Sequence, residues 1–110
     1  MDSERTFSDL VQVKRLQGCK TCITMQYTLP QPISRKIEGY ILPFGKLAYD
    51  LEVYSIIRID NDAILLQSRL GSVDIHIKFK NKEDTRIVSL FEVQLAAYLQ
   101  DELNVPISGV

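Results

Sequence analysis

Two cysteines, Cys19 and Cys22, have the C-x-x-C spacing that occurs in redox and metal-binding sites. A redox-active pair places its first cysteine at a helix N-terminus, where the thiolate is stabilised, whereas a strand is expected after this pair. A structural zinc ion requires four ligands, and the chain has no further cysteine. The motif therefore predicts two ordinary thiols and no bound metal. Strand alternation would point Cys22 outward and leave Cys19 in the preceding turn.

The only histidine, His76, lies in a segment of strict alternation, with Lys78 next to it on the same face. Asp74 also shares this face, but two residues along a strand is too far for a reliable hydrogen bond. A catalytic imidazole needs an acid that orients it and a nucleophile or substrate proton within reach. We therefore expect His76 to be a solvated surface residue and the chain not to be an enzyme.

The sequence Asp60-Asn61-Asp62 combines residues that can bind calcium with residues that form tight turns. The glycine and the terminal glutamate of an EF-hand loop are absent, so a hairpin turn is the better interpretation. The glycines are isolated, and no phosphate-binding loop is formed. No cofactor is expected.

The composition predicts one ordinary globular domain over residues 1–110, with 45% hydrophobic and 25% charged residues. No apolar run approaches the ~18 residues that span a membrane, and the polar start MDSERTFSD is unlike a signal peptide. These features favour a cytoplasmic protein without membrane association. The net charge is −1, although residues 1–46 carry seven basic and four acidic residues and residues 47–110 carry six and ten.

A helix is predicted over residues 89–103, because apolar side chains recur there every four residues. Ser89 and Glu92 have the spacing of a capping box, and Val88 and Val93 that of a hydrophobic staple. Asn104 is suited to the left-handed position just after the helix, and Pro106 prevents its continuation.

Strands are predicted over 20–29, 36–42, 51–60, 63–70 and 73–80, where apolar and polar residues alternate. Residues 85–88 are a possible sixth strand. A short helix is favoured within residues 1–18, with Phe7, Leu10, Val11 and Lys14 on one face, Thr6 or Ser8 as its cap and Gly18 as its C-terminal stop, although Val11 and Val13 also alternate as in a strand. The connections are too short for parallel crossovers. The expected fold is therefore α+β: a curled antiparallel sheet or small β-barrel of five to six strands, with the C-terminal helix packed on it.

Large apolar side chains on the supposedly solvated sides of these strands are the main anomaly. They are Tyr40, Leu42, Tyr54, Ile56 and Leu65, with Glu52 and Arg58 as their polar neighbours. Contiguous apolar surface of this kind usually marks an interface. The alternative is that the N-terminal helix or the loop 43–50 covers these side chains within the chain.

Two functions remain open from the sequence. The first is a non-catalytic protein-interaction module, a homodimer or a small subunit, adaptor or inhibitor of a larger assembly, which binds through the apolar sheet face. The second is a small single-stranded nucleic-acid-binding domain, in which cations of the first half flank Tyr27 and Tyr40 as stacking platforms. The negative net charge makes nucleic acid the less favoured partner.

Overall fold

The computed structural model describes residues 5–16, 20–49 and 56–109. Its centre is a six-stranded sheet in which every neighbouring pair is antiparallel. The strand order is β2 (Gln12–Leu16), β3 (Ile23–Thr28), β7 (Asp74–Phe79), β6 (Ile64–Arg69), β5 (Ile56–Asp60) and β4 (Ala48–Tyr49). Two short strands, β1 (Arg5–Thr6) and β8 (Ile107–Ser108), pair in parallel beside it.

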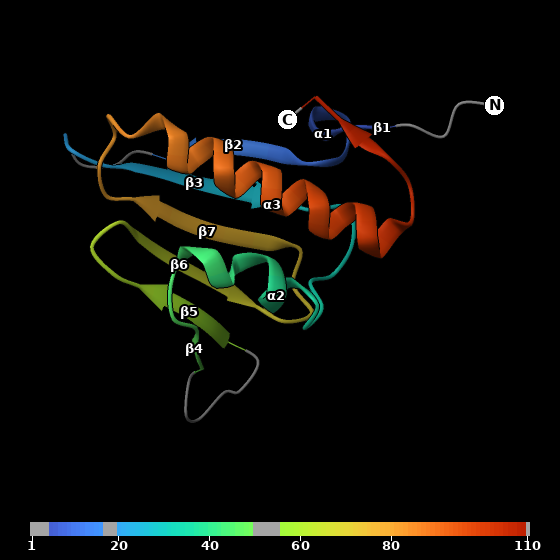
Figure 1. Ribbon diagram of the computed structural model, residues 1–110, viewed down its shortest axis with the longest axis horizontal. Helices are drawn as coiled ribbons and strands as arrows, with labels where there is room; N and C mark the ends of the chain where they lie inside the picture. The colour runs from blue at the N-terminus through green and yellow to red at the C-terminus, as the bar shows by residue number, and fades with distance from the viewer. Residues whose placement is uncertain (1–4, 17–19, 50–55, 110) are drawn as a thin grey trace.

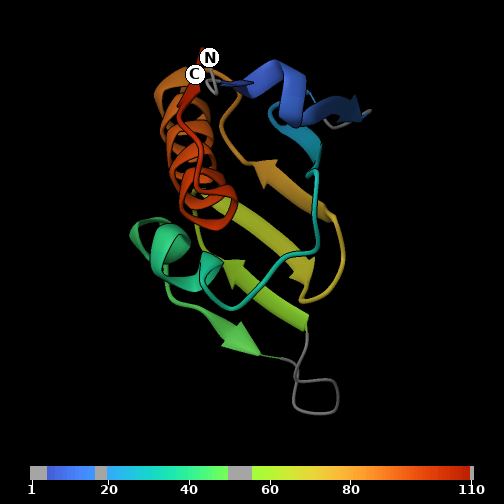
Figure 2. The same ribbon diagram turned by 90° about the vertical axis from the view of Figure 1, so that its right-hand side faces the viewer.

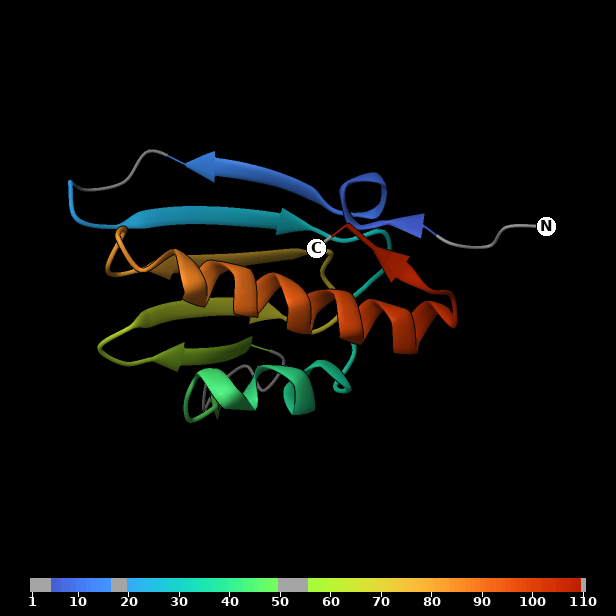
Figure 3. The ribbon, with the colours of Figure 1, turned by 45° about the horizontal axis from the view of Figure 1, so that its top comes forward.

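The helices lie on one side of this sheet, so the molecule has two layers (Figure 1). The long α3 (Thr85–Leu103) runs roughly along the direction of β7 (Figure 1), with α2 (Ile37–Ile41) and the 3-10 turn η1 (Leu42–Phe44) beside it (Figure 2). The short α1 (Phe7–Leu10) precedes β2 near the edge of the sheet. The opposite face of the sheet carries no helix among the described residues (Figure 3). We call it the open face.

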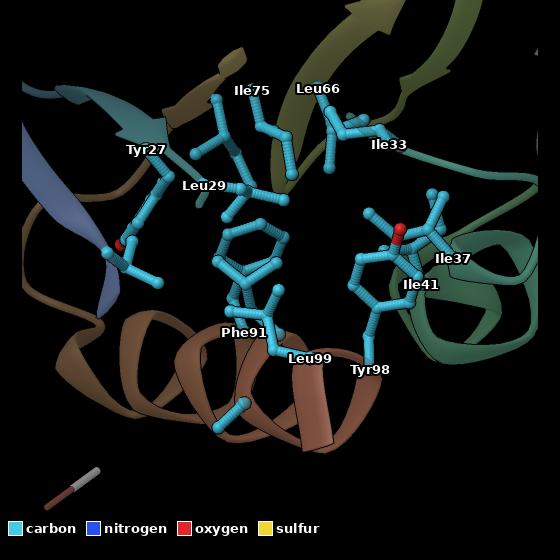
Figure 4. Close-up of a cluster of buried hydrophobic side chains, with 14 of the residues drawn as sticks. Tyr27, Leu29, Ile33, Ile37, Ile41, Leu66, Ile75, Phe91, Tyr98 and Leu99 are labelled. Carbon is cyan, nitrogen blue, oxygen red and sulfur yellow. The ribbon is translucent and has the colours of Figure 1, made fainter. Parts of the chain in front are cut away.

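The core fills the space between the sheet and the helices. Ile75 and Leu66 project from neighbouring strands toward Phe91 and Leu99 of α3, and Tyr98 of α3 points to α2 (Figure 4). Side chains of the core are almost fully buried, and aromatic rings meet at its centre, with Phe91 5.1 Å from Tyr27 and 6.1 Å from Phe79 between ring centroids. One continuous cluster therefore holds the two layers together.

The predicted α+β class, the antiparallel sheet and the C-terminal helix packed on it are confirmed. The sheet stays open rather than closing into a barrel, because β2 and β4 are its two edges within the described residues. The predicted strands 20–29, 63–70 and 73–80 correspond to β3, β6 and β7. Of the predicted strand 51–60, residues 51–55 lie outside the described residues, and the remainder is β5.

The predicted strand over 36–42 is wrong, because this segment forms α2 and the start of η1. Ile37 and Ile41 are buried together in the core. Residues four apart share a face both in a helix and in a strand, so the spacing of these two isoleucines fits both structures. Contact of both side chains with α3 favours the helix.

The helix α3 begins at Thr85, four residues before the predicted start, so the possible strand over 85–88 is also wrong. Ser89 and Val88 lie inside the helix, and no capping box or staple forms there. The first turn brings Ile87 and Val88 onto the core, which favours a longer helix. Its C-terminus agrees with the prediction: Asn104 adopts the left-handed conformation, with φ 56° and ψ 39°.

The short N-terminal helix is confirmed as α1, and the Thr6 side chain accepts a hydrogen bond from the Asp9 amide as predicted for a cap. The helix ends at Leu10, however, so its predicted continuation through Lys14 is wrong: Gln12–Leu16 forms the strand β2.

The prediction for Cys22 is also wrong. This residue is buried and disulfide-bonded, not an outward-facing thiol. It precedes the first paired residue of β3, so strand alternation does not fix its direction. Cys19 lies outside the described residues.

Candidate functional site

The structure separates the residues predicted to form one apolar binding face. Tyr40 and Leu42 lie in α2 and η1, on the helix side of the sheet. Ile56 and Arg58 in β5, and Leu65 in β6, lie on the open face. The other two residues, Glu52 and Tyr54, lie outside the described residues. Placing Tyr40 and Leu42 on the same sheet face as the others was wrong, because their segment is helical.

The open face is polar rather than apolar in the described strands. Ile56 stands opposite Arg69, and Leu65 stands opposite Asp60, with the pair of Arg58 and Gln67 between them. The two apolar side chains are therefore separated by a polar row. His76 continues this row on β7, where it is exposed as predicted and pairs with Gln67.

Tyr40 and Leu42 instead lie next to α3. The Tyr40 hydroxyl donates to Asp101 over 3.0 Å, and this hydrogen bond is the main reason why the pKa of the phenol is raised. Its ring meets Tyr98 edge-on, with 6.0 Å between centroids. Leu42 has an exposed fraction of 57%. Leu42 therefore adds exposed apolar surface beside α3.

The outward side of α3 has an apolar stripe of its own, formed by Leu90, Val93 and Ala97. We call it the outer stripe. All three side chains are exposed, Leu90 with a fraction of 56% and Val93 with 47%. Their spacing of three and four residues places them on one helix face. No described helix or strand lies in front of α3 in Figures 1 and 3.

A pocket of about 450 Å³ joins the outer stripe to η1. Leu90 and Ile87 of α3 line one side, and Pro43 and Phe44 line another. Phe44 is fixed from two directions, because its ring packs edge-on against Phe91 at 5.7 Å and its carbonyl accepts from Asn61 over 2.8 Å. Apolar side chains of the helix and of the turn therefore border the same pocket, together with Arg86 and Gln94, and the turn is held in place.

Opposite charges stand at the two ends of the outer stripe. Arg86 is exposed in the first turn of α3, and no ion pair engages it among the described residues. Asp101 is exposed near the other end, with 46% of its side chain accessible, although Lys36 lies 3.7 Å from it. Residues 86 and 101 are separated by roughly 22 Å along the helix axis.

Sequence reasoning missed the outer stripe because it considered only the stripe in which apolar side chains recur every four residues, and it interpreted Val93 as part of a hydrophobic staple. Leu90, Val93 and Ala97 do repeat at helical spacing, and this signal is visible in the sequence. The pocket that Leu90 shares with Pro43 and Phe44 was not predictable, because the sequence pattern of residues 36–42 predicts a strand. Tyr27, one of the two proposed stacking platforms, is fully buried and inaccessible to a base.

Within the described residues no group of three or more His, Cys, Asp or Glu side chains is placed to hold a metal ion. None of the described helices has the length and apolar character needed to cross a membrane. Comparison of the chain with protein-family models, curated proteins and solved structures finds no match.

Proposed function

We propose that this chain is a non-catalytic protein-interaction module that pairs with a second copy of itself through the outer stripe of α3. The observation that carries the proposal is the exposed apolar stripe on α3, which η1 borders across the pocket beside Leu90. Leu42, Leu90 and Val93 are each about half exposed, at 57%, 56% and 47%. Exposed apolar side chains that adjoin one another typically mark an interface, and symmetric pairing is the commonest way to cover them.

Charge complementarity selects an antiparallel arrangement of the two helices. A two-fold axis between Val93 and Gln94 would bring Arg86 of each copy opposite Asp101 of the other. A parallel arrangement would instead place like charges together. Ion pairs at the rim of an interface fix orientation and register, even where they add little affinity. The opposite charges at the two ends of the stripe therefore favour a self-complementary antiparallel pair.

The sizes of the apolar residues favour the same arrangement. The same axis places Leu90 of one copy opposite Ala97 of the other, so that a large side chain meets a small one at both ends. Such alternation lets two helices approach closely and interdigitate. Pro43 and Phe44 border Leu90 across the pocket and would extend the contact beyond the two helices.

The test is the mass of the protein in solution, measured by light scattering. The wild-type chain should have twice its monomer mass of 12.6 kDa. Leu90→Asp should remain folded and become monomeric, because Leu90 is exposed and is not part of the buried core cluster. A matched control is Leu65→Asp, which places the same change on the open face and should leave the dimer intact. Circular dichroism confirms that both variants are folded.

A charge swap tests the orientation. Arg86→Asp should weaken the dimer, because two acids would then face each other, and Arg86→Asp combined with Asp101→Arg should restore it. A monomeric wild-type protein would overturn the proposal. A dimer that survives Leu90→Asp but dissociates on Leu65→Asp would place the interface on the open face instead.

A further inference from the structure

The open face has a pocket of about 470 Å³ at the end of the β6–β7 hairpin, on the side of the sheet away from α3. Arg69 and Gln67 of β6 and Asp74 and His76 of β7 line it, and Ser72 closes it at the turn. Neither of the functions considered above uses these residues. They combine one guanidinium, one carboxylate and several hydrogen-bonding groups in a space large enough for a small molecule.

The carboxylate of Asp74 is held in place and charged. The Thr28 hydroxyl donates to its Oδ1 over 2.7 Å, and Gln26 donates to the same oxygen over 3.2 Å. The hydrogen bond from Thr28 is the main cause that lowers the pKa of Asp74, so the group stays ionised at neutral pH. Its Oδ2 has no hydrogen-bond partner among the described residues. A fixed carboxylate with one free oxygen is an acceptor for a positively charged donor.

Arg69 supplies the opposite charge. Arg69 and Asp74 each lie one residue beyond the registered pair Ser68 and Ile75, on neighbouring strands. The Arg69 side chain is exposed and makes no ion pair with any described residue, Asp74 included. Its five N–H donors are therefore available, in the planar geometry that suits a carboxylate. Among the described residues neither Arg69 nor Asp74 forms a salt bridge, although the two are close in register.

We propose that this pocket binds a small zwitterion, an α-amino acid, with its carboxylate on Arg69 and its ammonium group on Asp74 Oδ2. A ligand with both charges satisfies the two groups together, whereas a simple anion such as phosphate would be repelled by the adjacent carboxylate. Gln67 and His76 offer further hydrogen bonds to the ligand carboxylate. Ile56 also lines the pocket and provides an apolar wall for a side chain.

The experiment is a titration of the folded protein with each of the standard L-amino acids, followed by backbone amide shifts in NMR spectra. At least one amino acid should shift the amides of residues 67–76. For that amino acid, the N-acetyl derivative lacks the ammonium group and the amide derivative lacks the carboxylate, so both should bind roughly tenfold or more weakly. Inorganic phosphate should not compete.

Two variants and two controls locate the site. Arg69→Gln and Asp74→Asn should each weaken binding roughly tenfold or more, and the asparagine can still accept the hydrogen bond from Thr28. Arg58→Gln and Asp62→Asn remove the same charges outside the pocket and should leave binding unchanged. No response to any amino acid, or equal binding of the N-acetyl derivative or of phosphate, would overturn the proposal. Because the pocket and α3 lie on opposite faces, loss of the dimer would leave this result readable.

Discussion

The phenol of Tyr27, on β3, donates a hydrogen bond of 2.8 Å to the carboxylate of Glu92, on α3, across 65 positions of sequence. Tyr27 is fully buried and its ring packs against Phe91. Glu92 therefore supplies the acceptor that the buried hydroxyl needs. Burial of the phenol is the largest cause of its raised pKa, and the hydrogen bond to Glu92 adds to it. This hydrogen bond joins α3 to β3 at the edge of the core.

Tyr27→Phe tests this contact. At neutral pH the variant should lose about 1–3 kcal/mol of unfolding free energy, because the charged Glu92 loses its donor. The raised pKa means that the neutral phenol stabilises the folded state fully below the ordinary tyrosine pKa of about 10 and loses this effect as pH rises toward the folded value. The wild-type advantage should therefore shrink above about pH 10.

The measurement is denaturant unfolding of both proteins at neutral pH and near pH 11, just above the ordinary tyrosine pKa of ~10. The other four tyrosines are present in both proteins, so their ionisation cancels in the difference. A difference in unfolding free energy that stays constant over this pH range would show that the Tyr27 phenol ionises equally in the folded and unfolded chain.

Substitutions on the two faces of β7 should differ in their effect on the free energy of unfolding. Ile77 is fully buried between Met25 and Leu66, and Leu95 of α3 has an exposed fraction of 2%. Replacing either with alanine should cost about 2–5 kcal/mol, because each change leaves a cavity in the core. His76→Ala, next to Ile77 but exposed, should stay within ~0.5 kcal/mol of the wild type in the absence of ligand.

Denaturant titration of the three variants compares these losses directly. His76 is the matched control for Ile77, because the two neighbours differ in the face of the strand they occupy. Comparable losses for His76→Ala and Ile77→Ala would contradict the assignment of faces on which both the core and the open-face pocket depend.

The strands were predictable wherever alternation ran over several residues. In β7, residues 73–80 alternate without interruption, and only a strand places Ile75, Ile77 and Phe79 on one face. Residues 36–42 offer only two large buried positions, Ile37 and Ile41, and their spacing of four fits a strand and a helix equally. Whether residues 36–42 form a strand or a helix depends on their contact with α3, and this contact cannot be predicted from the sequence of the segment alone.

The candidate sites show the same limit. Glu92 has the local spacing of a capping residue for Ser89, but its carboxylate is bound by Tyr27, which lies far away in the sequence. Charges such as Arg69 and Asp74 are visible in the sequence, and the alternation of their strands predicts that they face outward. Their shared pocket depends on how β6 turns into β7. Local sequence patterns therefore predict which face of a strand or helix a residue occupies. A site depends on two segments that come together only in the fold.

Gly45, just after η1, and Gly39, inside α2, should respond oppositely to the same substitution. Gly45 has φ 149°, in a region that L-residues rarely adopt, and a Cβ at this position would collide with the side chains of Asn61 and Ile59. Asn61 cannot yield easily, because it donates to the Phe44 carbonyl and accepts from the amides of Ala63 and Ile64. Gly45→Ala should therefore destabilise the protein by ~1–3 kcal/mol.

Gly39, in contrast, lies inside α2, and a Cβ there would meet no atom within 4 Å. Gly39→Ala should stabilise the fold by up to about 0.5–1 kcal/mol, because alanine loses less backbone entropy in a helix. Thermal unfolding of both variants gives the signs. A stabilising Gly45→Ala would show that η1 is not held against Asn61, and a destabilising Gly39→Ala would argue that residues 37–41 are not helical. Since η1 lines the apolar pocket beside Leu90, Gly45→Ala should also weaken the proposed dimer, while Gly39→Ala should leave it intact.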